Sequence, residues 1–339
     1  LGTNTISFDE DAPVAADWIS TLSYDGFITG EDSSAVTTTG FAIAHDYSTG
    51  DNVGDYEVTP SGLSSSNYSI SFVKGTLSVE KAAAVVTLDD LGQDYTGGVL
   101  AATATTDPAG LTVVLEYSSV DPTDAGSYVV TATINEDNYQ GTATGTLVIS
   151  PATATITFDW LSQTYNGGTH GVRAITDPEG LQVDLTYDGS ADRPTNAGTY
   201  AVIGTINDDN YTGTNNDTFT INKRSLTATL GALSIKYGAD EPENEDWAAT
   251  LTYGDFVGDD AASAVDTSGI IVTYDTDVEN VGNYTATPAG LTATNYTITH
   301  AAGTLAVNKA DTTISLDALD DLSYTSTPIT LDATSEDGR

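Results

Sequence analysis

Short runs of alternating apolar and polar residues fill most of this chain, and Gly, Asp-Pro and Asn-Gly steps separate them. Thr, Val, Ile and Tyr dominate the runs, which is typical of short β-strands joined by tight turns. From Tyr128 to Ile134, every second residue is apolar and would face one side of a sheet. Around this run the pattern predicts strands at 84–89, 99–105, 111–117, 127–134 and 143–149. Helical periodicity is nearly absent, so the pattern predicts an all-β fold.

The strand pattern recurs in two kinds of module. The longer kind, type A, contains NVGDYEVTPSGLSSSNYSISFVKGTLSVEKA and later NVGNYTATPAGLTATNYTITHAAGTLAVNKA. The shorter kind, type B, contains DAGSYVVTATINEDNYQG and later NAGTYAVIGTINDDNYTG. The order A–B–B–A–B predicts domains at 1–82, 83–151, 152–224, 225–310 and 311–339. Such self-similarity indicates a tandem array of small domains rather than one large globule.

The modules follow one another almost without linkers. The last strand of one module runs nearly directly into the first strand of the next at SVEKA, VISPA, INKRS and VNKAD, so we expect an elongated, stiff rod. Module 1–82 matches module 225–310 but lacks a counterpart of the opening strand, Ser225–Leu230. The last stretch, 311–339, matches only the beginning of a type B module, and residue 1 is not Met. We therefore expect this chain to be a segment of a longer array.

Both module types resemble a known family of bacterial repeats. LTYGDFVGDDAASAV, followed by GNYTATPAGLTATNYTITHAAGTLAVNKA, resembles the MBG domain, and KYGADEP at 236–242 resembles its YGX variant. In the first type A module Phe8 and Asp9 replace the Tyr and Gly of that motif. Type B resembles shorter MBG or bacterial immunoglobulin-like repeats through DAGSYVV and NAGTYAV.

The resemblance implies small immunoglobulin-like β-sandwich modules of a large secreted bacterial adhesin, at the cell surface. It brings no catalytic residues to this chain. The D-x-G-x-Y pattern also predicts a tyrosine corner, in which the Tyr hydroxyl bonds to the backbone a few residues upstream.

The longer modules carry a segment that the shorter ones lack. It reads GDDAASAVDTSG at 258–269 and GEDSSAVTTTG at 30–40. Asp259 or Asp260 is a suitable N-cap, so the segment is a candidate for one or two helical turns. A helix there would also suit a β-grasp arrangement, which stays open as an alternative to the sandwich.

The net charge of the chain limits the classes of partner that it can bind. There are 9 Lys and Arg against 49 Asp and Glu, for a formal net charge of −40. This surface repels phosphates and anionic lipids, so we expect no nucleic-acid partner. No run reaches the ~20 apolar residues of a membrane helix, so we expect no membrane insertion. Cysteine is absent, and so are nucleophile and phosphate-binding motifs; we therefore expect no enzyme.

Acidic clusters at turns are the candidate chemistry. Glu136 and Asp137 recur as Asp208 and Asp209 at the equivalent place in the second type B module, in the loop before its last strand. Carboxylate oxygens at turns suit Ca²⁺. We therefore predict these four residues as Ca²⁺ ligands, with a solvated acidic face as the alternative interpretation. We expect no other cofactor.

The aromatic residues and histidines favour structural roles. Trp18 and Trp247 are equivalent, and we expect core anchors, with stacking on a sugar as the alternative. Two recurrent sets of tyrosines are expected to pack in strands and corners. His45, His170 and His300 fall at unrelated positions and are expected on surfaces or edge strands.

These features predict a non-catalytic stalk or spacer segment of a large extracellular repeat protein or adhesin. Its partners would be the neighbouring repeats of the same chain. One alternative is an adhesive module that binds a surface glycan or protein. Another is a filament subunit that binds other copies by strand exchange, because the first module lacks a strand.

Overall fold

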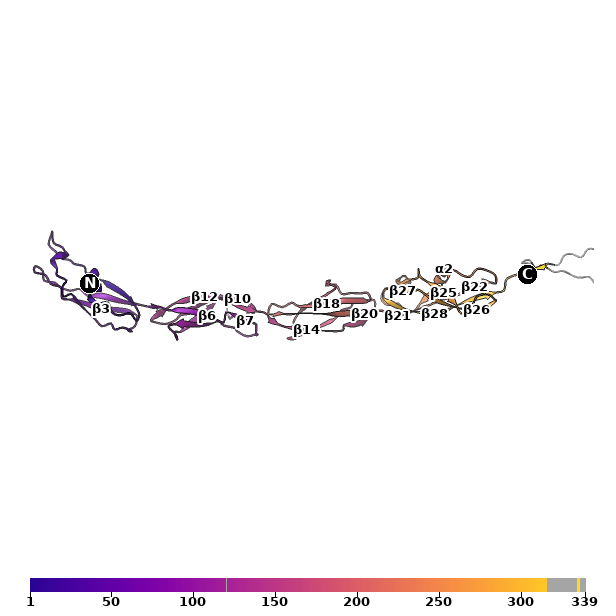
Figure 1. Cartoon of the computed structure of the whole chain (residues 1–339), viewed down its shortest axis with the longest axis horizontal. Helices are drawn as coiled ribbons and strands as arrows, with labels where there is room; N and C mark the ends of the chain where they lie inside the picture. Colours follow the sequence, from indigo (N-terminus) through magenta and orange to yellow (C-terminus); the bar gives the residue numbers. More distant parts are fainter. Residues whose placement is uncertain (120, 316–333, 336–339) are drawn as a thin grey trace, which may run out of the picture. The chain divides into compact units, whose positions relative to one another are not determined.

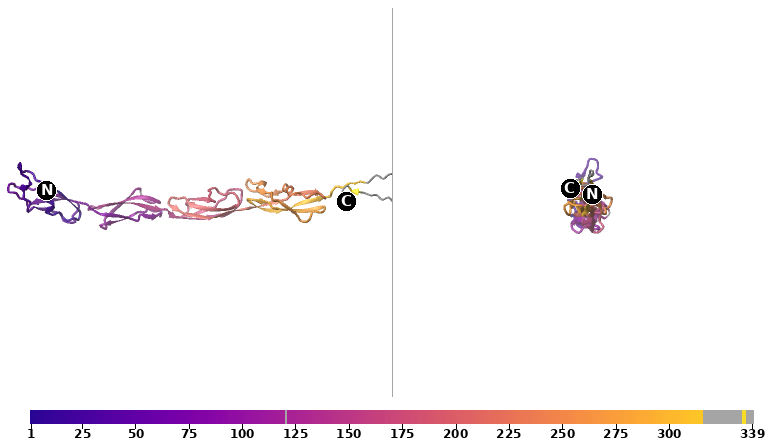
Figure 2. Two further views of the ribbon diagram at one scale, coloured as in Figure 1. Left: turned by 45° about the horizontal axis from the view of Figure 1, so that its top comes forward. Right: turned by 90° about the vertical axis from the view of Figure 1, so that its right-hand side faces the viewer.

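The computed structural model describes residues 1–119, 121–315 and 334–335. The chain divides into two compact units, Leu1–Thr153 with Asp208–Thr212, and Ala154–Asn207 with Gly213–Arg339. The colours in Figures 1 and 2 show that each module is built from one contiguous stretch of chain. Most of the predicted fifth module, 311–339, lies outside the described residues. The described helices include none that is long and apolar enough to cross a membrane.

The type A module of the first unit is built on one four-stranded sheet. Its elements are β1 (Thr3–Ser7), α1 (Ala15–Trp18), η1 (Ile19–Thr21), η2 (Ser33–Ala35), β2 (Ala42–His45), β3 (Gly54–Ser61) and β4 (Gly75–Glu80). The strand order is β1-β4-β3-β2, with β1 parallel to β4 and the other pairs antiparallel. The single turn α1 places Trp18, fully buried, against Val58, Leu77 and Val79 of this sheet.

The first type B module is a two-layer β-sandwich. Its strands are β5 (Ala82–Ala83), β6 (Val85–Asp89), β7 (Gly92–Asp94), β8 (Thr103–Asp107), β9 (Val113–Tyr117), β10 (Gly126–Ile134), β11 (Tyr139–Gln140) and β12 (Thr142–Ser150). The sheet β7-β12-β10-β9 forms one layer and the pair β6-β8 the other. Val86 from one layer packs with Ala132 and Ile134 from the other, as the alternation in the sequence predicts.

Four of the five strands predicted for this module are close to their observed positions. The predicted strand 99–105 is observed later, as β8, and the short strands β5, β7 and β11 are not in the prediction. β7 is only three residues long, GQD, and carries no apolar alternation by which it could be found. Its place depends on the parallel ladder with β12.

A glycine after the Asn-Tyr dipeptide lets two backbones approach in each type B module. A Cβ at Gly141 would lie 2.2 Å from the carbonyl oxygen of Ala84, and a Cβ at Gly213 would lie 2.2 Å from that of Ala154. Any other residue would force the opening strand away from the module.

The second unit repeats the type B sandwich. Its strands are β14 (Thr155–Asp159), β15 (Ser162–Thr164), β16 (Arg173–Asp177), β17 (Val183–Tyr187), β18 (Gly198–Ile206) and β20 (Thr214–Asn222). They form the sheet β15-β20-β18-β17 and the pair β14-β16. The short strands β13 (Ala152–Thr153) and β19 (Tyr211–Thr212) pair with each other in the first unit.

The type A module of the second unit has two full layers. Its elements are β21 (Arg224–Thr229), β22 (Ala232–Lys236), α2 (Asn244–Ala248), β23 (Thr252–Tyr253), η3 (Ala262–Ala264), β24 (Val265–Asp266), β25 (Ile271–Tyr274), β26 (Gly282–Ala289), β27 (Thr292–Ala293), β28 (Tyr296–Ala301) and β29 (Gly303–Asn308). The sheet β22-β29-β26-β25 faces the sheet β23-β21-β28 and the pair β24-β27. Beyond it, β30 (Ile314–Ser315) pairs with β31 (Thr334–Ser335).

The prediction of tandem all-β sandwich modules is confirmed. The candidate helical segment of each type A module forms one 3₁₀ turn, and a separate α-helical turn lies before it in the chain. In 258–269 the structure has a single 3₁₀ turn and then β24, because Val265 is buried in the ladder with β27. The α-helical turn is α2, where the Asp246 carboxylate accepts from the backbone N–H of Glu243, a capping box. No helix crosses the sheet within 1–82 or 225–310, which excludes the β-grasp alternative.

The two equivalent tryptophans are fully buried, so the core interpretation is confirmed and stacking on a sugar is excluded for both. The surface prediction for His170 is wrong. Its side chain is 4% exposed, and its Nδ1 lies 3.0 Å from Oε1 of Gln163. His170 occupies the position of Leu100 of the other type B module, where the shared fold places a side chain inward.

Candidate functional site: the joints between modules

The joint between the first two modules is formed by an Asn-Tyr dipeptide. The side-chain oxygen of Asn138 accepts from the backbone N–H of Val53 at 3.0 Å. Its amide nitrogen donates to Oδ1 of Asn52 at 2.9 Å. The ring of Tyr139 meets the ring of Phe8 edge to face, with centroids 5.3 Å apart. One side chain thus satisfies two polar groups of the preceding module, while the next covers an aromatic ring there.

The second joint repeats this arrangement within the first unit. Asn210 accepts from the N–H of Ala125 at 2.7 Å and donates to Oδ1 of Asp124 at 3.0 Å. Tyr211 meets Tyr95 edge to face at 5.3 Å. Asp replaces Asn as the acceptor, and the geometry is kept because the acceptor atom is a side-chain oxygen in both cases.

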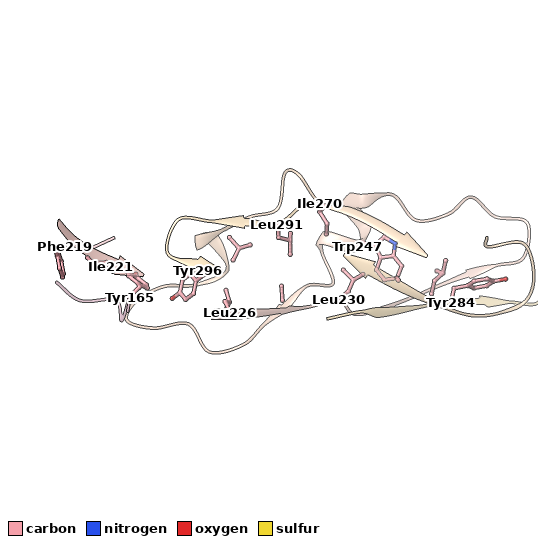
Figure 3. Close-up of a cluster of buried hydrophobic side chains, with 14 of the residues drawn as sticks. Tyr165, Phe219, Ile221, Leu226, Leu230, Trp247, Ile270, Tyr284, Leu291 and Tyr296 are labelled. Carbon is pink, nitrogen blue, oxygen red and sulfur yellow. The ribbon is translucent and has the colours of Figure 1, made fainter. Parts of the chain in front are cut away.

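The third joint, inside the second unit, has the same parts. Asn295 accepts from the N–H of Ala197 at 2.8 Å and donates to Oδ1 of Asn196 at 3.1 Å. Tyr296 meets Tyr165 at 5.6 Å, again edge to face. Figure 3 shows these two tyrosines side by side, between the cores of the two modules. The three joints therefore share one design.

Tyrosine corners tie the joints to the module cores. The hydroxyl of Tyr56 donates to the carbonyl of Asn52, four residues upstream, at 2.7 Å. The same bond recurs from Tyr128 to Asp124, from Tyr200 to Asn196 and from Tyr284 to Asn280, at 2.7–2.8 Å. The predicted tyrosine corner is confirmed. In three modules the residue held by the corner is also the acceptor of the next module's Asn.

The chain passes between modules with its backbone already paired. In the first joint the N–H of Ala82 donates to the carbonyl of Asn138 at 3.0 Å, and β5 then pairs with β11. In the third joint the N–H of Arg224 donates to the carbonyl of Asn295 at 2.9 Å, and β21 then pairs with β28. The crossing segment is therefore held at the same loop that contacts the preceding module.

Lysines at the module junctions strengthen this attachment. The Nζ of Lys81 donates to the carbonyl of Glu136 at 2.6 Å, and the Nζ of Lys223 donates to the carbonyl of Ala293 at 2.7 Å. A charge-assisted bond to a carbonyl is stronger than a neutral one. The clustering of basic residues at the junctions of so acidic a chain thus has a structural reason.

The third joint contains an additional carboxylate. The hydroxyls of Tyr165 and Tyr296 both donate to Oδ2 of Asp260, at 2.8 and 2.7 Å. The Tyr296 oxygen also accepts from the N–H of Val257 at 3.1 Å. Burial, together with the bond to Asp260, raises the pKa of Tyr165 to about 12. Asp260, predicted as a helix cap, instead bridges two modules.

The predicted calcium ligands lie in the joint loops. Oε1 of Glu136 accepts from the N–H of Thr112 at 2.8 Å, a bond that lowers the pKa of Glu136. Oδ1 of Asp208 accepts from the N–H of Asn210 at 2.8 Å. Asp137 and Asp209 are exposed. In the part of the chain that the structure describes, no three acidic or histidine side chains come together as a metal site. Calcium binding stays a prediction.

The joint asparagines were missed as functional residues, although a signal for them was in the sequence. An Asn-Tyr dipeptide recurs at the equivalent place in each of the four modules, at Asn67, Asn138, Asn210 and Asn295. The acidic residues that precede Asn138 and Asn210 favoured the prediction of a calcium site at these loops instead. The partner lies in another module, 85 to 99 residues away, and nothing local marks it.

Comparison with known proteins agrees with this architecture of tandem all-β modules. The MBG domain profile matches residues 84–153 and 154–225, and the MBG domain (YGX type) profile matches residues 8–78 and 226–306. The chain therefore belongs to the MBG domain family. Type A modules are the YGX type, as the resemblance predicted. No curated protein matches the chain.

Solved structures of several multi-domain proteins are similar to the chain at low identity. Sidekick-1 immunoglobulin domains 1–5 are 13% identical, over 76% of this chain and 67% of that one, with a TM-score of 0.25. Domains 1–6 of the surface layer protein SbsC are 13% identical, over 84% and 52%, at 0.19. Drosophila N-cadherin EC1-4 is 11% identical, over 92% and 99%, at 0.22. The chain spans about half of the surface layer structure. TM-scores of this size support no conclusion about this chain.

Proposed function

We propose that this chain is a non-catalytic spacer of a large extracellular bacterial surface protein, in which MBG modules are held in a stiff series. The repeated joint supports this proposal most directly. Three successive joints use an equivalent Asn, an edge-to-face aromatic pair and a paired crossing strand. Nearest-neighbour contacts of this kind determine the stiffness of a repeat array.

The energies involved are sufficient for such a role. Each joint Asn makes two hydrogen bonds to the preceding module, and a bond contributes about 1 kcal/mol. The edge-to-face ring pair adds about 1 kcal/mol. A joint worth about 3 kcal/mol is closed more than 99% of the time. A spacer needs this property, since a joint that opens often would behave as a flexible linker.

Single-molecule energy transfer across the second joint tests this proposal. The chain has no cysteine, so Val129→Cys and Ile203→Cys, both at exposed positions, give a clean pair of dye sites. We expect a narrow distribution of transfer efficiency. Asn210→Ala should broaden it, because two bonds across the joint are lost. The matched control is Asn67→Ala, which changes the equivalent exposed residue of the first module and should leave the distribution unchanged.

A flexible reference completes the experiment. Inserting Gly-Ser-Gly-Ser after Pro151 separates the modules with a linker that behaves as a random coil. If the unmodified chain gives a distribution as broad as this insertion variant, the joints are flexible and the proposed spacer role is wrong.

A further inference from the structure

The third tryptophan of the chain, Trp160, is explained neither by packing nor by backbone preference. It lies in the turn between β14 and β15 of the second type B module, and its side chain is 64% exposed. Its backbone is left-handed, with a φ of 62°. The equivalent residue of the first type B module is Asp90, which has a φ of 57°. Aspartate tolerates this conformation, whereas a bulky side chain is strained in it.

An arginine stands beside this tryptophan. In the first type B module, Oγ1 of Thr103 donates to Oδ2 of Asp90 at 2.6 Å, so the side chains at these two positions meet. In the second module the same two positions hold Arg173 and Trp160, on strands with the same register. Nη1 of Arg173 lies 3.9 Å from Oδ2 of Asp159, and both side chains are more than half exposed. This ion pair is therefore weak, and the guanidinium keeps most of its donors available.

A second arginine reaches the same edge of the module. A Cβ at Gly171 would lie 3.2 Å from both Cδ and Nε of Arg193, so this side chain lies across the backbone of Gly171. The carbonyls of Gly171 and Trp160 accept from one and the same nitrogen, Nε2 of Gln163, at 2.8 and 3.2 Å. One amide group therefore holds the turn that carries Trp160 close to the segment over which Arg193 lies.

The three positions carry opposite charges in the two type B modules. They are Asp90, Thr103 and Asp121 in the first module, and Trp160, Arg173 and Arg193 in the second. Pro122 and Pro194, which follow the last pair, accept equivalent backbone bonds from Leu100 and His170, which confirms the alignment. The formal charge thus changes from −2 to +2 in a chain of net charge −40. Within the described part of the chain, Arg193 forms no ion pair.

These side chains fit a sugar ring that bears a carboxylate. The exposed indole offers a flat apolar face, on which the C–H face of a pyranose can lie. Guanidinium groups bind carboxylates through pairs of N–H donors, and the carboxylate of Asp159 can accept from sugar hydroxyls. Strand addition of a peptide is disfavoured here, because Trp160 lies in a turn and its carbonyl already accepts from Gln163.

The net charge of the chain favours a ligand with a single negative charge. A polyanion would meet repulsion from the acidic surface on all sides of this edge. At physiological ionic strength such repulsion extends over about 8 Å. One carboxylate can reach the two arginines while the rest of a neutral glycan extends away from the module.

We propose that Trp160, Arg173 and Arg193 form a binding site for a glycan that ends in one acidic sugar, a pyranose with a carboxylate. The indole stacks on the sugar ring, and the two guanidinium groups bind the carboxylate. The first type B module lacks this site, because Asp90 and Asp121 would repel the ligand. Glycan binding of this kind is a property separate from the proposed spacer role.

Nuclear magnetic resonance of the whole chain with ¹⁵N-labelled tryptophan tests the proposal. Trp18 and Trp247 are fully buried, so the indole signal of Trp160, assigned with Trp160→Phe, reports on the site alone. The acidic probes are methyl glucuronide and sialyllactose, and their neutral counterparts are methyl glucoside and lactose. We expect a saturable shift of the Trp160 signal with an acidic probe, and binding more than about tenfold weaker with its neutral counterpart. Which acidic probe binds identifies the sugar.

A charge-matched pair of variants separates the site from general electrostatics. Arg173→Gln with Arg193→Gln should weaken binding of the acidic probe more than about tenfold. Lys74→Gln with Lys236→Gln removes the same number of positive charges elsewhere and should leave binding unchanged. Unchanged signals of Trp18 and Trp247 verify that the variants are folded.

Three results would overturn the proposal. The first is no shift of the Trp160 signal with either acidic probe at about 20 mM, far above a Kd of about 1 mM. The second is equal binding of acidic and neutral sugars. The third is a shift produced by an acidic peptide and by neither sugar, which would make the ligand a protein. The energy-transfer experiment on the second joint is unaffected by any of these results, so the two proposals fail independently.

Discussion

The two YGX-type modules share a sheet and differ in what covers it. Both have a four-stranded sheet of the same order, a helical turn with a buried Trp, and a tyrosine corner. Only the second has the strand β21. Only there do the residues that follow the recurrent position of Asn295 form a strand, β28. In the first, Ser69, Ile70 and Ser71 alternate in the same way but pair with nothing regular. Strand formation at this place thus depends on a neighbour more than on intrinsic preference.

Removing the covering side chain should make the second module behave like the first. Leu226→Ala empties a fully buried site and is expected to cost about 2–5 kcal/mol of folding free energy. Hydrogen exchange at β28 should speed up toward the rate of 68–73. The control is Ile70→Ala in the first module, where the side chain is only half-buried, and it should cost less. Equal costs at the two sites would mean that the covering strand does not distinguish the modules.

Alkaline pH should lower the free energy of unfolding of the second unit, because Tyr165 has a raised pKa. Its pKa is about 12 in the folded chain, against about 10 when unfolded. The unfolded chain therefore loses this proton first, so stability is intact below pH 10 and falls as the pH rises from 10 to 12, by up to about 3 kcal/mol. Urea unfolding at several pH values measures the fall.

The variant Tyr165→Phe should reduce this pH dependence, because the titrating group is removed. Tyr68→Phe changes the half-buried tyrosine of the first module and is expected to have a smaller effect. If the profile of Tyr165→Phe matches that of the unmodified chain, the raised pKa belongs to another tyrosine.

A hydrogen-bond acceptor for the ring N–H of Trp18 should stabilise the first module. Trp247 donates through its ring N–H to the hydroxyl of Tyr274 at 3.1 Å, whereas the buried ring N–H of Trp18 has no partner among the described residues. By the register of β2 and β25, His45 stands where the second module has Tyr274. His45→Tyr should therefore raise the free energy of unfolding by about 1 kcal/mol.

The reverse change, Tyr274→His, should lower the stability of the second module by a similar amount. Urea unfolding of both variants measures the pair. A destabilising His45→Tyr would show that the hydroxyl does not reach the indole nitrogen of Trp18.

The smallest expected effect concerns calcium. The joint loops of the type B modules carry Glu136, Asp137, Asp208 and Asp209, while both YGX-type modules have no acidic residue at the equivalent positions. A site with a Kd near 1 mM would add about 0.4 kcal/mol at 1 mM Ca²⁺. Thermal unfolding in Ca²⁺ and in EDTA at equal ionic strength checks this. A midpoint that does not change would remove the calcium prediction.

A calcium-dependent midpoint would need a control for general screening of the acidic surface. Glu136→Gln with Asp137→Asn removes one predicted site. Asp259→Asn with Asp311→Asn changes the same number of charges outside the joint loops of the type B modules. Only the first pair should abolish the dependence on Ca²⁺.

Much of each module follows from local sequence. The alternation in 127–134 predicts β10 within one residue, because a strand buried on one face must repeat with a period of two. The tyrosine corners also follow, since each bond spans only four residues. The helical segment predicted at 258–269 follows only in part: one 3₁₀ turn forms at Ala262–Ala264, and the chain then enters the strand β24, in which Val265 is buried.

The sequence by itself determined the repeat order, the strand periodicity, the corners and the acidic surface, because each depends on neighbours along the chain. Only the tertiary structure decided that Asn138, Asn210 and Asn295 join modules. The hydrogen-bond partner of each lies in the preceding module, 85 or more residues earlier in the sequence. It also decided that residues 68–73 form no strand, whereas their counterparts in the second YGX-type module form β28 beside β21. A β-strand is completed by the chain beside it, and that neighbour is a property of the folded molecule.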